Sequence, residues 1–124
     1  MKQKVLIIGA STNPSRYAYL ATNMLLDDGH EVHLHGLREG QVRGITIQTE
    51  QKMIENLDTI TLYVGPRNQQ SLYDYIVKLN PKRVIFNPGT ENPELYDLLR
   101  ENNIEVVVAC TLVMIRTKQF ELQG

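Results

Sequence analysis

The sequence predicts an α/β protein with an open, doubly wound and mostly parallel sheet of five strands, covered by helices on both faces. The first observation is the unbroken aliphatic run from Val5 to Ile8, which is typical of a strand buried on both faces of a parallel sheet. The second is that strand-like and helix-like segments alternate along the chain, as they do in doubly wound folds. The third is that the first four predicted strands each end close to a glycine.

The first unit is a strand at residues 4–8 followed by a helix at 16–28, with Gly29 as the residue after the helix end. A second strand follows at 31–35. The unit is about thirty residues long, the length of one βαβ unit, so we expect the two strands to lie parallel.

The remaining elements follow from the same kind of pattern. In chain order they are a short extra strand at 45–47, a short helix at 49–56, a strand at 59–64, a helix at 68–79, a strand at 83–86, a helix at 93–102 and a strand at 104–109. Asn92 is expected to cap the last of these helices, with Pro93 at its first position. The apolar residues of the tail, 110–124, predict partial packing but no particular fold.

Composition limits the classes of function. With 124 residues the chain is predicted to form a single domain, 1–124, with a real core. Its formal net charge of −1 argues against a nucleic-acid binder. No apolar run approaches the roughly 20 residues that span a bilayer, and no signal peptide is visible. The lone Cys110 excludes an intrachain disulfide and favours a reducing, cytoplasmic location. A protein partner and the oligomeric state, including a homo-oligomer, stay open.

The loop after the first strand predicts a phosphate-binding loop. Gly9 allows a sharp turn and a close approach to the backbone, and a run of small, polar and turn-forming residues follows up to Arg16. Ser15 is the expected N-cap of the helix. Because Arg16 opposes the helix dipole, a bound phosphate gives that cation a reason to be there.

The other strand ends indicate which nucleotide this loop holds. An NAD site usually has an acidic residue after the second strand, whereas this chain has Gly36, Leu37 and Arg38. Arg38 favours a ribose that carries a phosphate, as in NADP or coenzyme A (CoA). Arg67, after the third main strand, offers a second contact to an anion.

The stretch from Gly9 to Tyr17, which reads Gly-Ala-Ser-Thr-Asn-Pro-Ser-Arg-Tyr, together with the later Gly-His-Glu-Val at 29–32, resembles the small single-domain CoA-binding protein family. That family is similar to the N-terminal CoA-binding domain of the succinyl-CoA synthetase alpha subunit. The resemblance extends over nearly the whole chain. It implies a Rossmann-like fold that binds CoA or an acyl-CoA.

The resemblance also implies the residues of the site. In the first loop they are Gly9, Ala10, Ser11, Thr12, Asn13, Arg16 and Tyr17, most of them around the diphosphate. Near the ribose phosphate they are Gly36, Leu37 and Arg38. Along the adenine and pantetheine path they are Val64, Gly65, Pro66 and Arg67, and at the outer end they are Asn87, Pro88 and Gly89.

No catalytic residue and no metal site is predicted. His33 and His35 share one face of a strand, but no third metal ligand is evident, so packing or solvent contact is expected. Cys110 is expected to be a buried structural residue. Two hypotheses follow: a non-catalytic CoA- or acyl-CoA-binding module with a regulatory role, and a small NADP-dependent reductase or nucleotide-binding subunit of a larger enzyme.

Overall fold

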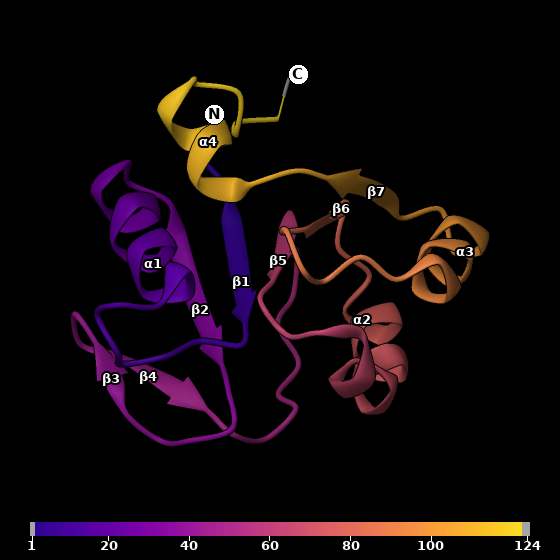
Figure 1. The fold of residues 1–124 in the computed structure, drawn as a ribbon, viewed down its shortest axis with the longest axis horizontal. Coiled ribbons are helices and arrows are strands. Elements are labelled where there is room, and N and C mark those ends of the chain that lie inside the picture. The colour runs from indigo at the N-terminus through magenta and orange to yellow at the C-terminus, as the bar shows by residue number, and fades with distance from the viewer. Residues whose placement is uncertain (1, 123–124) are drawn as a thin grey trace.

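The structure, a computed structural model, describes residues 2–122 and contains a sheet in the order β3-β4-β2-β1-β5-β6-β7 (Figure 1). The strands are β1 (Lys4–Ile8), β2 (Glu31–His35), β3 (Gln41–Val42), β4 (Ile45–Gln48), β5 (Thr59–Leu62), β6 (Arg83–Phe86) and β7 (Glu105–Val108). Every pairing is parallel except that between β3 and β4. The α/β class and the mostly parallel sheet are confirmed.

The predicted number of five strands is wrong, because the sheet of the described chain has seven. The expected extra strand is β4, and β3 pairs antiparallel with it across Arg43 and Gly44. Both turn residues have positive φ, +50° and +82°, as a tight two-residue hairpin requires. The sequence signal was weak because arginine, unlike asparagine or glycine, rarely takes this conformation.

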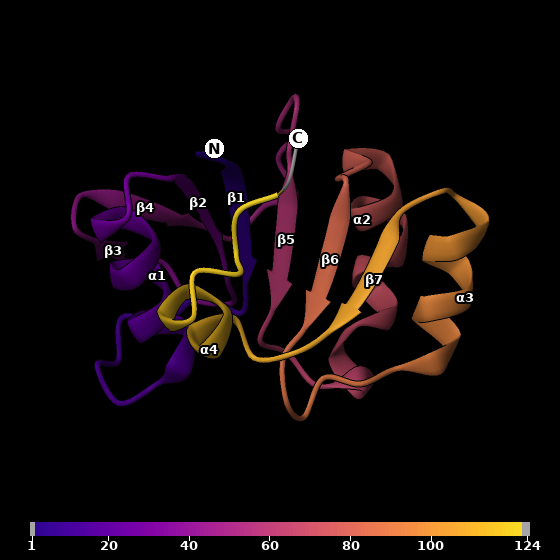
Figure 2. The same cartoon turned by 90° about the horizontal axis from the view of Figure 1, so that it is seen from above.

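Strand β1 lies at the centre of the sheet and is buried on both faces, as predicted. Val5 and Ile7 pack with α1 (Tyr17–Asp27) and α4 (Thr111–Arg116) on one face. Leu6 and Ile8 pack with α2 (Tyr73–Leu79) and α3 (Pro93–Glu101) on the other. All four side chains are at most 1% exposed. Figure 2 shows α1 and α4 near β1 and β2, and α2 and α3 beside β6 and β7.

The helix predicted at 68–79 is shorter than expected. Two 3-10 turns, Pro66–Asn68 and Gln70–Leu72, precede α2. The fully buried side chain of Gln69 explains the break, because its Nε2 donates to the carbonyl oxygens of Val64 and Thr90 at 2.9 and 2.8 Å. These bonds hold the segment against the strand ends, so the regular α-helix begins only after it, at Tyr73.

The helix predicted at 49–56 is absent, and this segment crosses the sheet as an irregular strap. Side chains from other elements donate hydrogen bonds to two of its backbone carbonyl oxygens. The Tyr75 hydroxyl donates to the Lys52 carbonyl at 2.5 Å, and Lys4 Nζ donates to the Glu55 carbonyl at 2.8 Å. Asn56 has a φ of +58°. Tertiary hydrogen bonds therefore override the local helix propensity.

The tail packs onto the sheet as expected and contains α4. Phe120 is 2% exposed, and the Arg83 guanidinium lies 4.8 Å from the centre of its ring while donating to its carbonyl oxygen. The last two residues of the predicted tail, 123–124, lie outside the described residues. Among residues 2–122, no helix is long and apolar enough to cross a membrane.

Candidate functional site

The carboxyl ends of β1, β2, β5 and β6 surround a cleft of about 720 Å³, which we call the strand-end pocket. Thirteen of the predicted site residues line it: Gly9, Ala10, Ser11, Thr12, Asn13, Arg16, Tyr17, Leu37, Arg38, Val64, Gly65, Pro88 and Gly89. The fold thus brings together four loops that are far apart in sequence, at the place where open parallel sheets bind ligands.

The first loop is held in shape by its own polar side chains. Ser11 Oγ accepts the N–H of Asn13 at 3.0 Å, and Asn13 Oδ1 accepts the N–H of Ser15 at 3.0 Å and its hydroxyl at 2.8 Å. The N–H groups of Gly9 and Ala10 both donate to the His35 carbonyl, which fixes the loop to the end of β2. These bonds preorganise the loop, so little of its conformational entropy remains to be lost on binding.

The N-terminus of α1 is left without a cap. Arg16, rather than the expected Ser15, occupies the N-cap position; its side chain makes no capping bond, and the first turn holds no acidic residue. In the described part of the chain, the backbone N–H groups of Ser11, Thr12, Tyr17 and Ala18 have no hydrogen-bond acceptor. Four unsatisfied donors and the positive end of a helix dipole make this a site for an anion.

Two arginines on the pocket wall increase its positive potential. Arg16 and Arg38 are exposed, and within residues 2–122 neither forms an ion pair. Arg38 therefore does not pair with the neighbouring Glu39 in this part of the chain. Two guanidinium groups from different loops suit a ligand with two separate anionic groups.

Apolar side chains also border the pocket. Leu37 is 93% exposed and Tyr17 is 69% exposed. Covering such large apolar side chains with a ligand is favourable, because it removes their surface from water. Tyr63 also lines the pocket, and burial raises its pKa to about 12, so its hydroxyl stays protonated. The pocket thus combines cationic and apolar walls.

Four predicted site residues do not line the pocket. Gly36 is required for packing, because a Cβ there would lie 2.8 Å from the carbonyl oxygen of Ala10. Asn87 is 2% exposed and joins strands: its amide nitrogen donates to Thr61 Oγ1 and the Leu62 carbonyl, both at 2.7 Å. Pro66 and Arg67 lie in the first 3-10 turn, beside the pocket. For these four, a ligand contact stays a prediction.

Sequence reasoning missed six residues of the pocket wall: Ser15, Ala18, Glu39, Ile47, Tyr63 and Thr90. Five of them are immediate chain neighbours of predicted residues, so widening each strand end by one position would have found them. Ile47 comes from β4, and nothing in its local sequence relates it to the first loop.

The histidines lie apart from the strand-end pocket, on or beside β2. His33 Nε2 is 2.6 Å from Glu31 Oε2, and the ring of the buried His35 is tilted against Tyr75 at 5.6 Å. Burial lowers the pKa of His35. Across residues 2–122 there is no group of three or more side chains that could hold a metal ion. Cys110 is a free, partly buried cysteine directly before α4.

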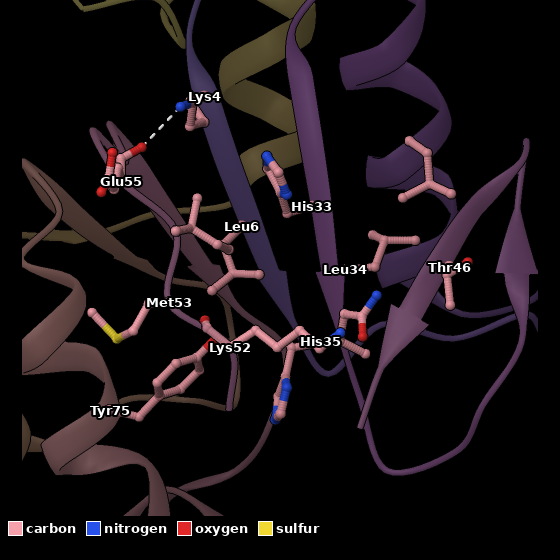
Figure 3. A pocket seen from close by; sticks show the side chains of 13 residues that line it. Lys4, Leu6, His33, Leu34, His35, Thr46, Lys52, Met53, Glu55 and Tyr75 are labelled. Atoms are coloured by element: carbon pink, nitrogen blue, oxygen red, sulfur yellow. Dashed lines mark hydrogen bonds between the residues drawn. The ribbon is translucent and has the colours of Figure 1, made fainter. Parts of the chain in front are cut away.

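A second pocket, of about 560 Å³, lies between β2, β4 and the 49–56 strap (Figure 3). His33 and His35 both line it, as expected for one face of a strand. Two of its polar side chains already bond within the protein, since Lys4 Nζ donates to the Glu55 carbonyl and the Tyr75 hydroxyl donates to the Lys52 carbonyl. The strand-end pocket, with its unsatisfied donors, is the better candidate site.

Comparison with known proteins identifies the family. The sequence matches the family described as CoA binding domain over residues 3–116. The chain belongs to this family. Comparison with the curated proteins gave no match.

Solved structures agree with this fold. A crystal structure of an uncharacterized protein is 52% identical, with a TM-score of 0.95 over 97% of this chain and 99% of that chain. A hypothetical protein from Pyrococcus horikoshii OT3 is 21% identical, with a TM-score of 0.85 over 97% and 85% of the two chains. A Thermus thermophilus protein, cell-free ID.343, is 22% identical, with a TM-score of 0.83 over 96% and 91%. At these lower identities the likeness shows the fold alone.

Proposed function

We propose that the protein binds coenzyme A or an acyl-CoA in the strand-end pocket and does not catalyse a reaction on it. The observation that carries this proposal is the uncapped N-terminus of α1, with its free N–H groups and Arg16, in a chain of the CoA binding domain family. The diphosphate of CoA would accept hydrogen bonds from this end of the helix, as pyrophosphates do at the first helix of dinucleotide-binding folds.

Arg38 is proposed to contact the 3′-phosphate on the ribose of CoA. It follows β2, where ribose contacts gather in this architecture, and it has no carboxylate partner in the described chain. The adenine and pantetheine groups would pass Val64 and Gly65, with Leu37 and Tyr17 covering apolar parts of the ligand.

The absence of turnover is proposed from the side chains of the pocket wall. The described wall carries no histidine, cysteine, aspartate or lysine, and Glu39 is its one carboxylate. Thioester hydrolysis needs a nucleophile with a base beside it. A module of this kind would act through occupancy of its site, as a regulatory subunit does, in the cytoplasm where free CoA thiols stay reduced.

The test is a calorimetric titration with CoA and NADPH, combined with a thermal unfolding series. CoA is expected to bind and to raise the free energy of unfolding by about 2.7 kcal/mol at a hundredfold excess over Kd. NADPH is expected to bind more weakly. An unchanged melting temperature with millimolar CoA would contradict the proposal. So would hydrolysis of acetyl-CoA above background that disappears in Glu39→Gln.

A further inference from the structure

The two edges of the sheet are built differently. The β3 edge is only two residues long, Gln41–Val42, and beside it Arg43 forms an ion pair of 2.6 Å with Asp27. The β7 edge is twice as long, and three of its four residues are valines. Short strands, charges and prolines normally protect an edge from pairing with another chain. β3 has such protection, whereas β7 has a charge only at its first residue, Glu105.

The backbone of β7 presents a regular row of unpaired groups. The N–H groups of Glu105 and Ala109 donate inward, to the carbonyl oxygens of Lys82 and Phe86 at 3.1 and 3.2 Å. Because hydrogen-bonding direction alternates along a strand, the N–H and C=O groups of Val106 and Val108 point away from the sheet. Helix α3 packs on the same face of the sheet as α2 through Leu95 and Leu99 and contributes no strand to this edge.

We infer that β7 pairs antiparallel with β7 of a second copy of this chain, around a two-fold axis at Val107. In this register Val106 lies opposite Val108 of the second copy, and each pair exchanges two N–H···O=C bonds, so that four bonds join the strands. A two-fold interface must be self-complementary, and this row of groups is. The two seven-stranded sheets then become one continuous sheet.

The side chains favour the same register. Val107 meets its own copy, Val106 meets Val108, and Glu105 lies opposite Ala109, so no two like charges face each other across the strands. Val108, which is 56% exposed in the single chain, becomes covered. A strand from an unrelated protein would have no reason to match this symmetry, which is why a second copy is the expected occupant.

The first experiment measures association by sedimentation equilibrium from micromolar to millimolar concentration. The wild type is expected to form dimers, and Val108→Pro is expected to stay monomeric because it removes an outward N–H that the single chain does not use. The control is Val113→Ala, which removes a valine of similar exposure (52%) from α4, away from the edge. It should dimerise like the wild type.

The second experiment tests the register by mild oxidation of single-cysteine variants in a Cys110→Ser background. Val107→Cys should form an intermolecular disulfide, since opposed Cβ atoms of a non-hydrogen-bonded pair are about 4.5–5.5 Å apart. Glu105→Cys should not, because the two copies of that position are roughly 14 Å apart along the strands. A wild type that stays monomeric up to millimolar concentration overturns the inference. It is also overturned if Val108→Pro dimerises as well as the wild type, or if the two cysteine variants crosslink equally.

Discussion

Helices α1 and α3 each follow an interior strand of the same sheet, β1 and β6, yet the hydrogen bonding at their N-termini differs. At α3, the Asn92 side chain accepts the N–H of Leu95, Pro93 removes one donor, and Glu94 places an acid in the first turn. At α1, Arg16 takes the N-cap position without a capping bond, and no acid follows. The protein's own side chains therefore provide an acceptor for a backbone N–H group at the N-terminus of α3, whereas no side chain caps the N-terminus of α1.

The two helix ends therefore have different consequences: the cap of α3 stabilises the fold, whereas the uncapped end of α1 leaves donors for a ligand. An uncapped helix end costs stability, and a cation at that end adds to the cost through the helix dipole. The chain carries this cost at the one helix of the two whose N-terminus faces the strand-end pocket. A bound diphosphate would supply the missing acceptors, so the predictions below exchange or remove features of the two helix ends.

The largest effect is expected from Arg16→Asp, which gives α1 the kind of cap that α3 has. The free energy of unfolding of the ligand-free protein should rise by about 0.5–2 kcal/mol. CoA affinity should fall at least about a hundredfold, because a charge-assisted contact is lost and a like charge is added. Urea unfolding and calorimetric titration measure the two. Arg16→Gln is the control: it should bind CoA more weakly, but its free energy of unfolding should not rise. Equal CoA affinity in the wild type, Arg16→Asp and Arg16→Gln would contradict the account.

Arg38→Ala should weaken CoA binding by roughly one to two powers of ten, the value of one charge-assisted pair. It should hardly change the binding of dephospho-CoA, which lacks the ribose phosphate. Stability should be retained, because Arg38 is exposed and makes no ion pair in the described chain. Paired titrations of both ligands check this; equal losses would mean that Arg38 does not contact that phosphate.

Asn92→Ala removes the cap of α3 and is the reverse of the change at Arg16. The protein should lose about 1–2 kcal/mol of stability, since the side chain caps the helix and also donates to Gln69 Oε1 and the Tyr73 hydroxyl. CoA affinity should stay at the wild-type value, because Asn92 does not line the pocket. Denaturant unfolding and titration measure both quantities, and a parallel loss of affinity would show that the two helix ends are not independent.

The smallest effect concerns pH and a region apart from both helix ends. Burial keeps His35 neutral in the folded protein by lowering its pKa from 6.5. Below about pH 6.5 the unfolded chain therefore binds a proton that the folded chain does not, so stability falls as the pH falls. His35→Leu should reduce this dependence in melting experiments between pH 7.5 and 5, and an unchanged slope would exclude His35 as its source.

The sequence predicted the parts of the fold that depend on local pattern. The unbroken Val5–Ile8 run predicted the central strand, and Asn92-Pro93 predicted both the cap and the first residue of α3 correctly. The sequence-based prediction failed where long-range contacts determine the local structure. In the 49–56 strap, backbone carbonyl groups accept hydrogen bonds from Tyr75 and Lys4. The β3–β4 hairpin was missed because its turn depends on a positive φ at Arg43.

In the strand-end pocket, too, features of local sequence could be predicted and features that depend on tertiary contacts could not. The glycine-containing strand ends and both arginines of the pocket could be predicted, since each follows a recognisable strand. The packing role of Gly36 against Ala10 and the bonds of Asn87 to β5 could not, because they depend on how the loops meet in space. Ile47 reaches the pocket only through the pairing of β4 with β2.

The most direct test of the central claim is a titration of the ¹⁵N-labelled protein with CoA, followed through the backbone amide resonances. The account predicts the largest shifts at Ser11, Thr12, Tyr17 and Ala18, whose N–H groups lack acceptors in the described chain. Glu94 and Leu95, at the capped end of α3, should hardly move. Saturating shifts elsewhere, for example along the second pocket at His33 and Thr46, with the α1 amides unchanged, would contradict it.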